Sequence, residues 1–139
     1  MEGDVPEETV TLRSDLSIVL ASLPLFTGLQ PDLLIAIARE VEWLSLPGGS
    51  PLFEAGDTPD AMYVVLSGCL GVYASPQTND PRRFMGRIVA GDTAGEMGLI
   101  SGRPRTGTVI ALRDSELARL SREAFDRVFL RHPEAMLRI

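Results

Sequence analysis

Short apolar stretches separated by glycine-containing turns fill the middle of this 139-residue chain and constrain its fold more than any other feature. Stretches of this length and composition, bounded by turn residues, are typical of antiparallel strands. We expect strands at residues 41–46, 51–53, 61–66, 69–74, 83–90, 107–112 and 116–120, with the two on either side of Ser67-Gly68 forming a hairpin.

Apolar residues at helical spacing predict helices on both sides of this strand region. One helix is expected at residues 14–23, a second from Pro31-Asp32 and a third from Ser121, while residues 95–101 predict a single helical turn. The pattern therefore predicts a mainly β fold with flanking helices, an antiparallel β-roll or jelly roll with N-terminal helices and a C-terminal helix.

The length of the chain is enough for one domain with a buried core and too small for two ordinary ones. We expect a loose N-terminal arm at residues 1–11, which are polar and acidic, and a single domain at residues 12–139. The net charge is −6, but residues 81–139 carry eleven arginines and seven acidic residues, a net charge of +4. An anionic ligand is therefore more favourable in the second half of the chain.

Composition excludes several classes of function. All thirteen basic residues are arginine, so Schiff-base and lysine-base chemistry are impossible here. The single Cys69 and single His132 exclude an internal disulfide, a cysteine metal cluster and a multi-histidine metal site. The negative charge argues against nucleic-acid binding, and no apolar run approaches the length of a membrane helix. We expect no cofactor, no membrane insertion by this chain and a reducing, cytoplasmic setting.

The segment between residues 91 and 109 combines glycines, an acid and an arginine around a short predicted helix. A helix start presents free N–H groups to a phosphate, and Gly95 lets the backbone approach a ligand closely. Arg105 can donate two parallel hydrogen bonds to a phosphate, and Thr106 adds a hydroxyl and an N–H beside it. Glu96 would repel phosphate but can accept from a sugar hydroxyl. The segment therefore suits a ribose phosphate.

Residues 95–109, with GEMGLI followed by RPRTGTV, resemble the phosphate-binding cassette of cyclic nucleotide-binding domains. Three upstream segments match landmarks of the same family in order: 25–29 (LFTGL), 53–57 (FEAGD) and 62–68 (MYVVLSG). The resemblance covers roughly residues 23–130 and implies a β-roll that binds cyclic AMP or cyclic GMP and regulates another domain through its C-terminal helix.

The same resemblance implies individual roles for the cassette residues. Glu96 would take the ribose 2′-hydroxyl and Arg105 the exocyclic phosphate oxygens, while backbone groups of Gly95 and Thr106 would complete the phosphate site. The ligand-binding residues are then expected to be Gly95, Glu96, Met97, Arg105 and Thr106. The Thr106 position is compatible with cyclic GMP as well as cyclic AMP.

The chain departs from the family pattern at three cassette positions. Ala94 replaces a bulky apolar residue, and Gly98 and Gly107 stand where alanine is common. We expect these losses of side chain to loosen the cassette. The resemblance also implies a last helix that covers the base, and we expect this helix to be mostly absent or short in the sequence up to Ile139.

A finer likeness involves three other segments. Residues 43–49, 120–125 and 131–135 are similar to bacterial cyclic nucleotide-binding domains that precede patatin-like phospholipase domains. This likeness implies a regulatory piece of a larger hydrolase or membrane protein, tethered to an effector domain or acting as a homodimer.

Other interpretations of these residues remain open from the sequence alone. Glu96 and Arg105 could form an internal ion pair that fixes a loop. The domain could also have lost its ligand and serve as a protein-interaction or dimerisation module. We expect no catalytic residues, and we expect Trp43, Phe53 and Cys69 to belong to the core.

Overall fold

The computed structural model describes residues 30–74 and 83–131. The predicted arm at residues 1–11, the predicted helix at residues 14–23, and His132 lie outside the described residues. The domain boundaries at residues 1–11 and 12–139 therefore stay a prediction.

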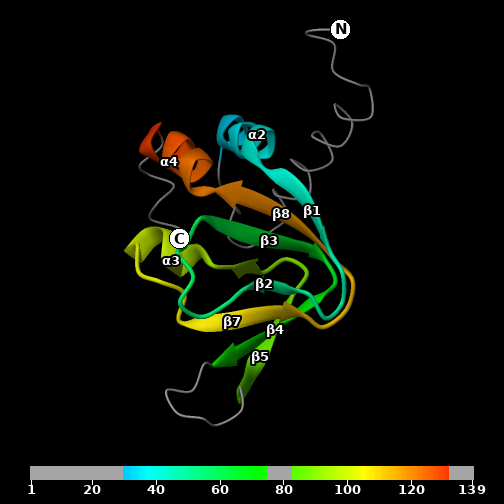
Figure 1. The fold of residues 1–139 in the computed structure, drawn as a ribbon. Coiled ribbons are helices and arrows are strands. Elements are labelled where there is room, and N and C mark those ends of the chain that lie inside the picture. The colour runs from blue at the N-terminus through cyan, green and yellow to red at the C-terminus, as the bar shows by residue number, and fades with distance from the viewer. Residues whose placement is uncertain (1–29, 75–82, 132–139) are drawn as a thin grey trace, which may run out of the picture.

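Within residues 30–74 and 83–131, eight strands form two antiparallel four-stranded sheets (Figure 1). The first sheet has the order β1-β8-β3-β6, with strands at Glu42–Leu46, Ser115–Ser121, Ala61–Ser67 and Thr93–Ala94. The second has the order β2-β7-β4-β5, with strands at Pro51–Phe53, Gly107–Ala111, Cys69–Ala74 and Arg83–Val89. The predicted mainly β class and β-roll architecture are confirmed, while the short strand β6 was not predicted.

In the described part of the chain, three helices accompany the sheets: α2 at Pro31–Glu40, α3 at Glu96–Ser101 and α4 at Arg122–Arg131. Figure 1 shows α2 and α4 side by side against the first sheet, and α3 at one end of the roll. Arg127 of α4 forms an ion pair with Glu40 of α2 at 2.8 Å, which ties the two helices together. The helices expected from Pro31, from Ser121 and at residues 95–101 are therefore confirmed.

Strand β3 shows why the first sheet can pack on both sides. Successive side chains of a strand point to opposite faces. Met62 and Val64 join the cluster beneath the helices, whereas Ala61, Tyr63 and Val65 join the cluster between the two sheets. All five are buried, so β3 is an interior strand that packs on both of its faces.

The hairpin predicted around Ser67-Gly68 is wrong. Strand β3 pairs with β8 and β6, while β4 pairs with β5 and β7. Gly68 therefore carries the chain from one sheet to the other, with a φ of +102° that favours glycine. A Cβ atom at this position would lie 2.2 Å from Oγ of Ser115, so the crossover requires glycine for space as well.

The expected core position of Trp43 is also wrong. Its side chain is 49% exposed, and its indole N–H donates to Oε2 of Glu116 at 2.6 Å. Ser45 donates to the same oxygen at 2.7 Å. A surface carboxylate thus satisfies the polar edge of the indole, which a spacing argument cannot foresee. Cys69 is half-buried on β4.

Candidate functional site

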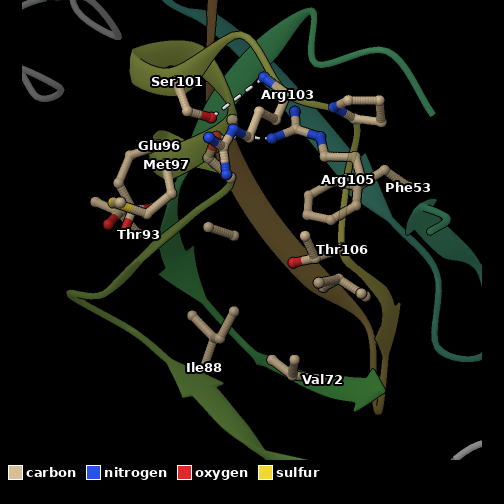
Figure 2. Close-up of a pocket in the computed structure, with 16 residues that line it drawn as sticks. Phe53, Val72, Ile88, Thr93, Glu96, Met97, Ser101, Arg103, Arg105 and Thr106 are labelled. Carbon is tan, nitrogen blue, oxygen red and sulfur yellow. Dashed lines mark hydrogen bonds between the residues drawn. The ribbon is translucent and has the colours of Figure 1, made fainter. Parts of the chain in front are cut away.

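A cavity of about 450 Å³ opens between α3 and the second sheet. Figure 2 shows the polar side chains Glu96, Arg103 and Arg105 at one end of this cavity and the apolar Val72 and Ile88 at the other. A cavity with one charged end and one apolar end suits a ligand of the same polarity.

All five residues expected to bind ligand line this cavity: Gly95, Glu96, Met97, Arg105 and Thr106. Met97 is 65% exposed and Thr106 is exposed, whereas Gly95 and Glu96 are half-buried. The sequence thus predicted a set of residues that the fold brings to one place, although they are separated by up to eleven positions. Their contacts with a ligand stay a prediction.

Arg105 is the most deeply placed charged group of the cavity, with only 6% of its surface exposed. Nη1 donates to the main-chain oxygen of Gly95 at 2.7 Å, and Nη2 donates to that of Ala61 at 2.5 Å. The guanidinium carbon lies 4.2 Å from the centre of the Phe53 ring, a cation–π contact. Phe53 is therefore half-buried beneath the arginine and forms part of the cavity wall.

The Nε atom of Arg105 is buried and has no hydrogen-bond partner among the described residues. Burial lowers the pKa of Arg105, and Tyr63, Asp60 and Asp57 oppose that shift. Since arginine stays protonated even after such shifts, the site contains a buried positive charge with an unused donor.

Glu96 does not neutralise this charge. Within residues 30–74 and 83–131, Arg105 forms no ion pair with Glu96 and instead bonds to main-chain oxygens. The internal Glu96–Arg105 ion pair, one of the two open interpretations, is therefore wrong. Both side chains line the same cavity while remaining separate, so a ligand could contact each of them.

The backbone of Arg105 is held by the turn that follows β2. The amide of Gly56 donates to the oxygen of Arg105 at 2.7 Å, and the amide of Arg105 donates to the oxygen of Asp57 at 2.9 Å. Gly56 has a φ of +93°, and Asp57 closes its own turn by accepting from the amide of Glu54 at 2.9 Å. The turn at residues 55–57 therefore fixes the loop that carries Arg105, between α3 and β7.

Two glycines leave the space that the guanidinium occupies. A Cβ on Gly95 or on Gly98 would lie 2.7 Å from Nη1 of Arg105, and one on Gly98 would also lie 2.8 Å from Cβ of Pro59. Gly95 has a φ of +84° at the start of α3. The expectation that Gly98 loosens the cassette is wrong, because the arginine side chain fills the space of the missing methyl group.

Arg122, the first residue of α4, connects that helix to the cassette. Its guanidinium donates to the oxygen of Pro59 at 3.1 Å and 3.3 Å and to the oxygen of Leu99 in α3 at 3.5 Å. Its amide donates to the oxygen of Asp60 at 2.8 Å. Residues 59–61 thus accept from Arg122 at one end and from Arg105 at the other, a link that the sequence alone did not indicate.

In the part of the chain that the structure describes, no group of His, Cys, Asp and Glu side chains has the arrangement of a metal site. No described helix has the length and apolar character needed to span a bilayer.

Comparison with known proteins extends these observations. The family model of the cyclic nucleotide-binding domain matches residues 43–132. Lysophospholipase NTE1 of Saccharomyces cerevisiae is 31% identical over 123 residues, which cover 81% of this chain and 7% of that protein. This relative agrees with the expected likeness to regulatory domains of phospholipases.

Two solved structures give the same result for the fold. The regulatory domain of Toxoplasma gondii PKA, co-crystallised with cAMP, has a TM-score of 0.85 and 26% identity over 90% of this chain and 48% of that chain. The catabolite activator protein of Thermus thermophilus has a TM-score of 0.75 and 29% identity over 83% and 54% of the two chains.

The chain belongs to the cyclic nucleotide-binding domain family, as the cassette residues indicated. It is a regulatory ligand-binding domain with a β-roll fold. It spans less than a tenth of the length of the curated lysophospholipases that it matches, at 7% of one and 9% of another.

Proposed function

We propose that this domain binds cyclic AMP or cyclic GMP in the cavity beside α3 and passes the binding signal to a tethered effector through α4. The observation that carries the proposal is the buried guanidinium of Arg105, which is 6% exposed and whose Nε has no partner among the described residues. Within the described residues no carboxylate forms an ion pair with Arg105. A buried charge without an ion-pair partner is costly, so an anion that enters the cavity is favoured.

The two ends of the cavity support a nucleotide rather than a simple anion. The cyclic phosphate lies against Arg105 and the backbone N–H groups of Gly95 and Thr106, and Glu96 accepts from the ribose 2′-hydroxyl. The base then lies over the apolar side chains of Val72 and Ile88, at the opposite end of the cavity. Thr106 is exposed between these two ends, so its hydroxyl is available to either purine.

Transmission to α4 is supported by the contacts of Arg122. A ligand phosphate that binds Arg105 changes the hydrogen bonds from Arg105 to the oxygens of Gly95 and Ala61. Residues 59–61 are also hydrogen-bonded to Arg122. The ligand can change the free-energy difference between two positions of α4 by no more than the difference between its binding free energies for those two positions. The lysophospholipase relatives support a lipid hydrolase as the tethered effector.

Calorimetric titration with cyclic AMP, cyclic GMP and non-cyclic 5′-AMP tests the proposal. We expect both cyclic nucleotides to bind, and Arg105→Ala to weaken binding about tenfold or more, because a charge-assisted hydrogen bond contributes about 1.5–3 kcal/mol. Arg113→Ala is the matched control, because Arg113 is exposed and does not line the cavity. No heat at millimolar cyclic nucleotide would contradict the proposal and favour an interaction or dimerisation module.

A further inference from the structure

Arg103 is a second arginine of the cavity that the cassette residues already assigned do not include. It follows α3 and lines the cavity, and Figure 2 shows it at the same end as Glu96 and Arg105. Its side chain is exposed and forms no ion pair with any described residue. Arg103 is therefore free to meet a ligand, in contrast to Arg119 and Arg127, which are paired with carboxylates.

The backbone holds Arg103 at the mouth of the cavity. Gly102 ends α3 in a left-handed conformation, with a φ of +73°, and donates to the oxygen of Gly98 at 2.9 Å. The amide of Arg103 then donates to Oγ of Ser101 at 3.2 Å. These two bonds fix the direction in which the chain leaves the helix, so the position of the Cα atom of Arg103 is set before a ligand enters.

Without Arg103, the charged end of the cavity lacks the net positive charge that would complement a cyclic phosphate. Arg105 and Glu96 together carry no net charge, and Arg105 already uses one N–H of Nη1 and one of Nη2 for main-chain oxygens. A cyclic phosphodiester carries one negative charge. With Arg103 included, the charged end of the cavity has a net charge of +1, which complements that of the ligand.

We propose that Arg103 is a second ligand-binding arginine, which donates from the mouth of the cavity to an exocyclic oxygen of the cyclic phosphate. This inference rests on the proposed function, because it names a further contact of the same ligand. Arg105 contacts the phosphate from the buried side and Arg103 from the solvent side. Since Arg103 is exposed, its contribution to the binding free energy is smaller than that of Arg105 and is weakened by salt.

The experiment measures the affinity of the whole chain for cyclic AMP and cyclic GMP in wild type, Arg103→Gln, Arg103→Lys and the control Arg113→Gln. Glutamine keeps length and polarity but removes the charge, and lysine keeps the charge. We expect Arg103→Gln to weaken binding about fivefold at 50 mM salt and Arg103→Lys to restore most of the loss. The loss should shrink at 300 mM salt, and Arg113→Gln should bind like wild type.

The possible failures are distinguishable. If wild type binds and Arg103→Gln binds equally well, the inference is overturned while the proposed function stands. If Arg103→Lys binds as weakly as Arg103→Gln at an unchanged melting temperature, a charge contact is excluded and the inference is again overturned. If wild type binds neither nucleotide, the proposed function fails and the inference fails with it.

Discussion

Nη1 of Arg105 lies 2.7 Å from the main-chain oxygen of Gly95 and donates a hydrogen bond to it. Both residues belong to the same cassette, so the arginine is anchored to the backbone that would face the ligand. A guanidinium held by main-chain oxygens keeps its full positive charge, whereas one held by a carboxylate would be neutralised. The site is therefore preorganised for an anion before any anion enters.

Arg105→Lys should reduce both stability and ligand affinity, although the charge is retained. The ammonium of lysine is a point donor and cannot replace the planar fork that meets Gly95, Ala61 and the Phe53 ring together. We expect the free energy of unfolding to fall by about 1–2 kcal/mol and affinity to fall about tenfold. Urea unfolding and calorimetry measure the two quantities, with Arg113→Lys as control. Wild-type values for both would show that the fork geometry is unimportant.

Glu96→Gln should reduce the preference of the domain for ligands that carry a 2′-hydroxyl. A hydrogen bond to a carboxylate contributes more than one to a neutral amide, by about 1 kcal/mol. We expect the ratio of dissociation constants for 2′-deoxy cyclic AMP and cyclic AMP to fall about fivefold in the variant. Using this ratio cancels the change in repulsion between residue 96 and the phosphate. A ratio that does not change would exclude Glu96 as the ribose ligand.

Gly98→Ala should destabilise the domain even though alanine favours a helix. The added methyl group would lie 2.7 Å from Nη1 of Arg105 and 2.8 Å from Cβ of Pro59, so the guanidinium must move. Overpacking costs about 1–3 kcal/mol, against a gain of about 1 kcal/mol from helix propensity. We expect a lower melting temperature and weaker cyclic nucleotide binding. Ile100→Ala, on an exposed position of the same helix, is the control and should leave the melting temperature almost unchanged.

Gly68→Ala should be far more destabilising than Gly49→Ala, although both glycines have a positive φ. A Cβ on Gly49 meets nothing within 4 Å, so alanine there adds only backbone strain of about 1–2 kcal/mol. A Cβ on Gly68 would also collide with Ser115, at 2.2 Å from Oγ and 2.6 Å from Cα. Denaturant unfolding of the two variants separates strain from collision. Similar losses in both would mean that the crossover has room for a side chain.

The strand pattern predicted most of the fold because glycine turns and apolar stretches are local signals. It misplaced the connection at Gly68, since a turn between two strands has the same composition whether the strands pair or enter different sheets. The strands that pair with β3 and β4 decide which sheet each enters, and these partners, β8 and β7, lie far along the chain. Strand β6 was missed because two residues are too few to show the alternation of apolar and polar side chains that marks a strand.

That the cassette residues line one cavity could be predicted, because they are close in sequence and resemble the motif of a known family. What could not be predicted is how Arg105 is satisfied, because its partner Ala61 lies 44 positions earlier. Phe53, which forms the cation–π contact, is also distant, and the sequence indicated only an apolar residue there. Arg103 was visible in the motif, but only its place in the cavity distinguishes it from an ordinary solvated arginine.

The tripeptide Pro59-Asp60-Ala61 has a consequence for whatever follows this domain in a longer protein. Its three carbonyl groups accept from Arg122 at one end and from Arg105 at the other. Coupling free energy between two sites is reciprocal. If nucleotide binding is coupled to α4 as we propose, a neighbouring segment that holds α4 changes nucleotide affinity by the same factor by which the nucleotide changes the affinity of that segment for α4. Under the proposed function, an effector attached through α4 would therefore change the affinity of the domain for its nucleotide. An affinity measured on the isolated domain would then be the baseline for that change.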